Sequence, residues 1–201
     1  MKTLAINLYK FDELSDEAKE KAIKNYKNKY YEEIGIFWQE DNFNSIKAIL
    51  NFFDVKIKYF EIDFSSAARS FINWEFTSEY NEELKNLFGA RLFKYISNNY
   101  IGKKTGSFNS VFDGKHDMGR CLFTGYCADH DIISPVIEFL EKPTKYINFE
   151  DLINNVIYAG FKYIENDYNY QNSDEAITEE ILNKDLYFNA SGKIIFLNEI
   201  N

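Results

Sequence analysis

The chain has 201 residues, of which 45% are hydrophobic and 18% aromatic, and its formal net charge is −9. A length below roughly 250 residues fits one hydrophobic core, and so many large apolar side chains exclude an intrinsically disordered chain. No run approaches the roughly 18 apolar residues of a membrane span, so we expect one soluble, cytoplasmic domain over residues 1–201 with no membrane partner.

The N-terminal part predicts a strand followed by two amphipathic helices. Apolar and polar residues alternate over residues 4–8, which is typical of a strand. Ser15 precedes two acidic residues, as at a helix N-cap, and the helical period continues to about residue 31. A second stretch with helical spacing of apolar residues runs from about residue 38 to residue 53.

The next segment predicts a β-hairpin and a third helix. Apolar residues alternate over residues 55–59 and then take the opposite parity from Phe60, which predicts a β-bulge or an exchange of the buried face. Residues 72–76 form a regular, half-buried strand pattern. From residue 82 to residue 100 the apolar positions follow the helical period, and Gly102 is the expected end of that helix.

The C-terminal half predicts further hairpins and helices. We expect strands at residues 108–112 and 121–127, a short helix after Pro135, and a longer helix opened by a capping box of Asn148 and Asp151. Ser173 caps a last helix, and residues 186–188 and 194–197 flank a closing turn. Because the strands come mainly as hairpins, the predicted fold class is α+β, with a mostly antiparallel sheet covered by amphipathic helices.

The charge is unevenly distributed along the chain. Residues 128–201 hold 14 acidic and 5 basic residues, a balance of −9 that equals the net charge of the whole chain. We expect the carboxylates of Glu175, Glu179 and Glu180 to bind a basic surface of a partner protein, although an ordinary solvated helix face has the same composition.

A basic segment, residues 90–127, precedes this acidic end. It holds 6 basic and 2 acidic residues, a local balance of +4. Lys103, Lys104, Lys115 and Arg120 are candidates for contacts with an RNA backbone. The alternative is a solvated lysine loop above core aromatic residues.

Four potential metal ligands fall in one short window: His116, Cys121, Cys127 and His130. Zinc prefers such ligands, but the cysteines are six residues apart in a predicted strand and lack the close spacing of a structural zinc site. We therefore expect small buried thiols on a sheet face and no cofactor.

The two histidines are also the candidates for acid–base catalysis. His116 neighbours Asp117, and His130 lies between Asp129 and Asp131, with both histidines in predicted loops. Residues adjacent in sequence rarely face each other, so we interpret both as surface histidines and expect no enzyme. A small hydrolase or nuclease centred on His116 is the catalytic alternative.

Both ends of the chain carry similar helix starts. Residues 11–22 (FDELSDEAKEKA) and residues 173–177 (SDEAI), the latter followed by a strand and the turn at residues 191–193, resemble a family of small phage- and prophage-encoded proteins labelled "antitoxin of toxin–antitoxin system". The resemblance implies an accessory protein of a mobile element, either an antitoxin or an inhibitor of host defence such as an anti-CRISPR. It implies no catalytic or binding residues.

Taken together, the sequence predicts a non-enzymatic phage protein in the cytoplasm of a bacterial host. It would bind and inhibit a defence effector, either a protein or a ribonucleoprotein complex. The alternatives are an antitoxin or an RNA-associated inhibitor acting through residues 90–127, and the His116 hydrolase or nuclease.

Overall fold

The computed structural model describes residues 7–77, 79–101 and 122–196, without the side chains of residues 29–39 and 79–82. The chain divides into two compact units. Unit 1 comprises residues 1–37 and 168–201, and unit 2 comprises residues 38–167. The expectation of a single domain stays a prediction, because a compact unit need not fold by itself.

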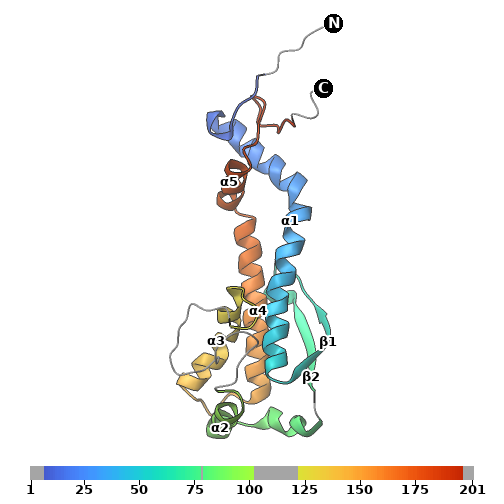
Figure 1. The fold of residues 1–201 in the computed structure, drawn as a ribbon, viewed down its shortest axis with the longest axis vertical. Coiled ribbons are helices and arrows are strands. Elements are labelled where there is room, and N and C mark those ends of the chain that lie inside the picture. Colours follow the sequence, from blue (N-terminus) through green and yellow to red (C-terminus); the bar gives the residue numbers. More distant parts are fainter. Residues whose placement is uncertain (1–6, 78, 102–121, 197–201) are drawn as a thin grey trace. The chain divides into compact units, whose positions relative to one another are not determined.

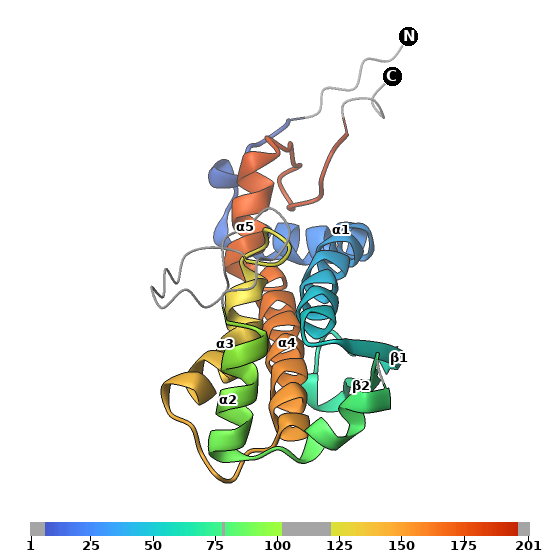
Figure 2. The same ribbon diagram turned by 60° about the horizontal axis from the view of Figure 1, so that its bottom comes forward.

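Helices make up most of the described residues (Figures 1 and 2). The α-helices are α1 (Asp16–Phe52), α2 (Gly89–Asn99), α3 (Ala128–Glu141), α4 (Phe149–Gln171) and α5 (Asp174–Asn183), and the strands are β1 (Val55–Glu61) and β2 (Phe71–Phe76). Short 3-10 helices span Phe11–Glu13, Ala67–Arg69 and Glu79–Asn86. The two strands pair antiparallel, which confirms the α+β class in its coarse form. The sheet of the described residues is smaller than predicted, since it contains only this one hairpin.

Helix α1 replaces the two helices predicted for the N-terminal part. It starts after Ser15, whose Oγ accepts a hydrogen bond from the Ala18 N–H at 3.3 Å, as the cap predicted. It continues through the expected break because no proline interrupts it, and its single internal glycine, Gly35, costs only about 1 kcal/mol relative to alanine. The chain leaves the helix at Asp54, which adopts a left-handed conformation with φ of 58°.

The β1–β2 hairpin contains the predicted irregularity. Val55 pairs with Phe76 and Ile57 with Trp74, but the next paired residue of β1 is Tyr59. Lys58 is therefore an extra residue in β1, and side chains after it point to the opposite face from the one that simple alternation would give. The change of parity read from the sequence is confirmed as a β-bulge.

The helix predicted for residues 82–100 is divided into two elements. A 3-10 helix ends at Asn86, and α2 starts at Gly89. Gly89 has φ of 51°, which interrupts a right-handed helix, and Phe88 forms an antiparallel bridge with Asn148. The hydrophobic period continued through this break, so the pattern alone did not reveal it.

The strand predicted for residues 121–127 is wrong over its described part, residues 122–127, which form turns. The buried carboxylate of Asp129 accepts the N–H groups of Phe123 and Thr124 at 2.7 and 2.8 Å, so these groups are not free for a strand ladder. Gly125, with φ of 91°, turns the chain between them and the helix. The other strand predicted nearby, residues 108–112, lies outside the described residues.

Helix α3 starts seven residues before Pro135, whereas the prediction placed its start after that proline. A proline has no N–H to donate to the carbonyl four residues earlier, here that of Asp131. The Oγ–H of Ser134 donates to this carbonyl at 2.8 Å instead. A side chain thus supplies the missing hydrogen bond, and the helix tolerates Pro135.

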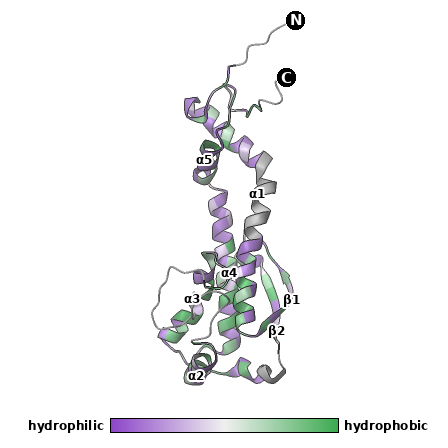
Figure 3. Ribbon diagram, viewed as in Figure 1, coloured by the Kyte–Doolittle hydropathy of each residue, from purple (hydrophilic) through white to green (hydrophobic). Residues whose placement is uncertain are grey.

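Helix α4 starts with the predicted capping box. The Asp151 N–H donates to Asn148 Oδ1 at 2.7 Å, and the Asn148 N–H donates to Asp151 Oδ2 at 3.2 Å. Within unit 2 this helix packs tightly against α1, since a Cβ added to Gly160 would lie 2.5 Å from an Ile46 carbon. Figure 3 shows hydrophobic residues in the first turns of α4 and hydrophilic residues at its end.

Unit 1 contains the second predicted cap and the closing turn. Ser173 Oγ accepts a hydrogen bond from the Ala176 N–H at 3.1 Å, which confirms the cap of α5. The predicted closing hairpin is reduced to an antiparallel bridge between Phe188 and Ile194, and Phe188 also bridges Tyr9. Residues 1–6, most of the first predicted strand, lie outside the described residues.

Candidate interaction surfaces

Most of the predicted nucleic-acid and catalytic residues lie outside the described part of the chain. These residues are Lys103, Lys104, Lys115, Arg120 and His116. The RNA-associated inhibitor and the hydrolase or nuclease therefore stay predictions.

Two of the four potential metal ligands, His116 and Cys121, lie outside the described residues, and the other two lie within them. Cys127 is exposed, so the expected buried thiol is wrong at this position. His130 lies in the first turn of α3 rather than in a loop, with its Nδ1 at 3.3 Å from Asp131 Oδ1. Within residues 7–77, 79–101 and 122–196, no three His, Cys, Asp or Glu side chains are grouped to hold a metal ion.

The predicted acidic residues all lie on α5 in unit 1. Glu180 is partly buried and forms an ion pair with Lys184 at 2.8 Å. Glu175 and Glu179 are exposed and form no ion pair with any described residue. They are four residues apart and therefore neighbours on one helix face, which also presents Leu182, whose side chain is 53% exposed. Two of the three predicted glutamates are thus available to a partner.

Unit 2 presents a surface that the sequence did not single out, which we call the aromatic hairpin. It consists of Tyr59, Phe60, Phe64 and Phe71, which are 57, 45, 37 and 43% exposed. The rings of Tyr59 and Phe71 lie on neighbouring strands with centroids 5.4 Å apart. Tyr59 and Phe71 share one face of the hairpin, whereas the ring of Phe60 lies against that of Phe43 in α1, with centroids 4.4 Å apart. Large aromatic side chains bury much area when they are covered, so the exposed rings form a candidate interaction surface.

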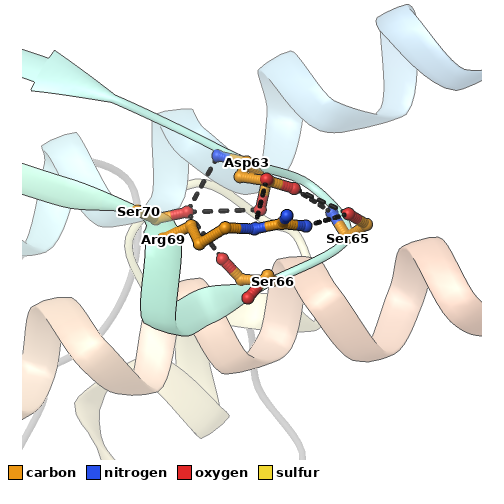
Figure 4. A network of polar contacts seen from close by, with 5 residues as sticks. All are labelled: Asp63, Ser65, Ser66, Arg69 and Ser70. Atoms are coloured by element: carbon orange, nitrogen blue, oxygen red, sulfur yellow. Dashed lines mark hydrogen bonds and ion pairs between the residues drawn. The ribbon is translucent and has the colours of Figure 1, made fainter.

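A polar network holds the connection between β1 and β2 (Figure 4). Asp63 Oδ1 accepts hydrogen bonds from the N–H and the Oγ–H of Ser65, at 3.0 and 2.7 Å. Asp63 Oδ2 lies 2.8 Å from Arg69 Nε, and the Asp63 N–H donates to Ser70 Oγ at 2.9 Å. These contacts fix the loop that contains Phe64.

The network also affects the acidity of Asp63. Its pKa is lowered from the ordinary value, first because the Ser65 side chain donates a hydrogen bond to the carboxylate, and also because Arg69 is close by. The ionised form of Asp63 is therefore the form that holds the loop.

The outer face of the hairpin is also charged. Lys58, the bulged residue, forms an ion pair with Glu75 of β2 at 2.5 Å. The hydrogen bond from Lys58 lowers the pKa of Glu75 below its usual value. The aromatic rings are thus flanked by ionised groups, an arrangement that resembles the centre and the rim of protein interfaces.

The sequence did contain a signal for this surface. The pattern of β2 assigns Ile72, Trp74 and Phe76 to the buried face, and all three pack against the core. Phe71 then falls on the opposite, solvent-facing side. The sequence pattern placed Tyr59 on the buried face of β1, and the bulge in that strand moves its side chain to the face of Phe71. The parity of β2 therefore predicts the exposure of Phe71, whereas the exposure of Tyr59 depends on the position of the bulge.

Comparisons with known proteins found no relative of this chain. No family model matches it, and neither a curated protein nor a solved structure matches it. No α-helix within the described ranges has the length and apolar character needed to cross a membrane.

Proposed function

We propose that this protein is a non-enzymatic, phage-derived binder that inhibits a bacterial defence effector in the host cytoplasm. The observation that carries the proposal is the aromatic hairpin of unit 2. The bacterial defence effector as partner rests on the resemblance of residues 11–22 and 173–177 to the phage family described above.

The aromatic hairpin favours a protein partner for two reasons. Single exposed apolar residues are normal, but Tyr59 and Phe71, whose rings lie together on one face of the hairpin, are what a partner would desolvate at the centre of an interface. The hydrogen bonds around Asp63 also hold the hairpin connection before binding, which lowers the conformational entropy lost when the complex forms.

The acidic face of α5 would contribute attraction rather than most of the affinity. Glu175 and Glu179 are exposed, and carboxylates of this kind accelerate association with a basic surface and weaken as salt is added. A basic groove of an effector that binds nucleic acid has the complementary charge, whether the effector is a protein or a ribonucleoprotein.

The proposal is tested by affinity capture from a bacterial host lysate, read by mass spectrometry and followed by binding of the purified target. The test variant is Tyr59→Ala/Phe71→Ala. The matched control is Tyr146→Ala, because Tyr146 is 79% exposed and lies outside the hairpin. We expect the native protein and the control to capture the same defence effector and the double variant to lose it. Equal capture by all three proteins, or no defence protein captured by the native chain, would reject the proposal.

The acidic contribution is tested separately by charge reversal with Glu175→Lys/Glu179→Lys. We expect weaker binding to the captured effector and a flatter dependence on salt, because favourable long-range attraction is removed. Glu180→Lys is a less direct test, since it also breaks the ion pair with Lys184. Binding of the double variant at native strength and with native salt dependence would exclude α5 from the interface.

A further inference from the structure

Unit 1 contains a basic pocket of about 490 Å³ that neither the charge distribution of the sequence nor the proposed function involves. It is lined by Lys21, Lys24, Asn25, Ser191, Lys193 and Ile194. Three of these six residues are lysines, although the whole chain carries a net charge of −9.

The fold builds this pocket from two distant segments of the chain. Lys21, Lys24 and Asn25 are three and four residues apart on α1 and therefore share one helix face. The second segment, residues 189–194, packs on the same helix through Gly192. A Cβ at Gly192 would lie 2.1 Å from the Ala18 carbonyl oxygen, so only glycine allows this approach.

The second segment is also held internally. Asn189 Oδ1 accepts hydrogen bonds from the Ser191 N–H, the Ser191 Oγ–H and the Lys193 N–H, at 3.0, 2.8 and 3.0 Å. The Gly192 N–H donates to the Asn189 carbonyl at 3.0 Å. The backbone that carries Lys193 is thus fixed before any ligand binds.

The charges of the pocket are only partly compensated. Lys21 forms an ion pair with Glu17 at 2.7 Å, and its hydrogen bond lowers the pKa of Glu17. Lys24 and Lys193 are exposed and form no ion pair with any residue of the described ranges. Glu20 lies four residues before Lys24 without pairing to it. Two ammonium groups therefore line the hollow without a paired carboxylate among the residues that the structure describes.

We propose that this pocket binds a phosphate group of a nucleotide, either free or within an RNA strand. Lys21, Lys24 and Lys193 supply the charge, and the Asn25 amide supplies a further hydrogen-bond donor. A volume of about 490 Å³ is that of a small-molecule site. Lysines contact phosphates without reading bases, so the site recognises phosphate rather than sequence. It uses no residue of the aromatic hairpin and does not depend on the proposed function.

The experiment titrates the full chain with two probes, ADP and a uridine decamer RNA, at low salt. Chemical shifts of backbone amides localise the binding, and anisotropy or calorimetry gives the affinity. The test variant is Lys24→Ala/Lys193→Ala. The control is Lys19→Ala, which removes a lysine of α1 that does not line the pocket.

We expect the amides of Ser191, Gly192 and Lys193 to shift, and affinity to fall about tenfold or more in the double variant but not in the control. If the phosphate comes from RNA, a plot of the logarithm of RNA affinity against the logarithm of salt concentration has a slope of about −2 for the native protein. The slope is about −0.7 for the double variant, because two phosphate contacts are removed. Binding of ADP alone assigns a free nucleotide. Shifts elsewhere, no binding of either probe, or equal losses in variant and control would overturn the proposal.

Discussion

The two units differ in the interactions that stabilise each of them internally. The core of unit 2 draws buried residues from the last part of α1, both strands, α2, α3 and α4. The core of unit 1 is much smaller: Phe11, Leu14, Ala18, Ala22, Tyr26, Ile177, Ile181, Phe188 and Ile194. It is supplemented by ion pairs of Lys10 with Asp185 and of Lys27 with Asp174, both at 2.6 Å. Such exposed ion pairs contribute little to the free energy of unfolding. The stability of unit 1 therefore depends mainly on its small apolar core.

The largest effect is expected in the core of unit 2, at Phe53. Its side chain is fully buried and contacts the rings of Phe52, Tyr100 and Phe149. Phe53→Ala should lower the free energy of unfolding by about 3–5 kcal/mol, because it removes a large buried ring and leaves a cavity. Denaturant unfolding measures the change. Tyr158→Ala on the exposed side of α4 is the control and should change stability by about 0.5 kcal/mol or less. Equal losses would contradict the assignment of the core.

A smaller and local effect is expected at Gly192 in unit 1. Gly192→Ala places a Cβ against the Ala18 carbonyl oxygen at a φ of 81°, so the turn must move or strain by about 1–3 kcal/mol. Amide hydrogen exchange should accelerate in α5 and residues 188–194 while α3 keeps its protection. The neighbouring Ala190→Ser should leave exchange unchanged. Uniform acceleration in both units would mean that they unfold together.

The next effect concerns the cap of α5. Ser173→Ala removes the acceptor of the Ala176 N–H and should cost about 1 kcal/mol. Ser173→Asp retains an acceptor and serves as the control. Thermal unfolding with exchange at Ala176 and Ile177 measures both. If the alanine variant equals the native protein, the cap does not contribute to the stability of unit 1.

The smallest effect is a pH dependence of the hairpin connection in unit 2. The pKa of Asp63 is lowered in the folded protein. The stabilisation that its ionised carboxylate gives to the hairpin connection is therefore fully present above the ordinary carboxyl pKa, and it is lost as the pH falls through the lowered pKa. The amide signal of Ser65 should therefore shift in acid below about pH 4. Asp63→Asn should remove this transition, and an unchanged transition in that variant would assign it to another carboxylate.

Local signals in the sequence predicted the local structure well. Both serine caps and the Asn148–Asp151 box depend on side chains within three residues of their partners, and all three are present. The irregularity of β1 was predicted from the change of parity at Phe60, and the structure places the extra residue at Lys58. These features are decided by short-range chemistry, so a sequence contains them directly.

Features that depend on distant contacts were missed. The break before Gly89 accompanies the pairing of Phe88 with Asn148, 60 residues later in the chain. The turns at residues 122–127 depend on Asp129, which is close in sequence but whose burial the local pattern did not show. The basic pocket combines α1 with a turn more than 160 residues later in the chain. The periodic pattern of apolar residues in one segment does not reveal a contact with a distant segment. The exposed position of Phe71, in contrast, could be predicted from the alternation in β2.

The affinity of the aromatic hairpin for the captured effector is the most direct test of the account. We expect Tyr59→Ala/Phe71→Ala to bind the purified effector about 1,000-fold more weakly, because truncated hot-spot aromatics cost about 2 kcal/mol each and every 1.4 kcal/mol is about tenfold in affinity. Tyr146→Ala should bind within about twofold of the native protein. A folded double variant with the affinity of the native protein would contradict the claim that unit 2 binds its partner through these rings.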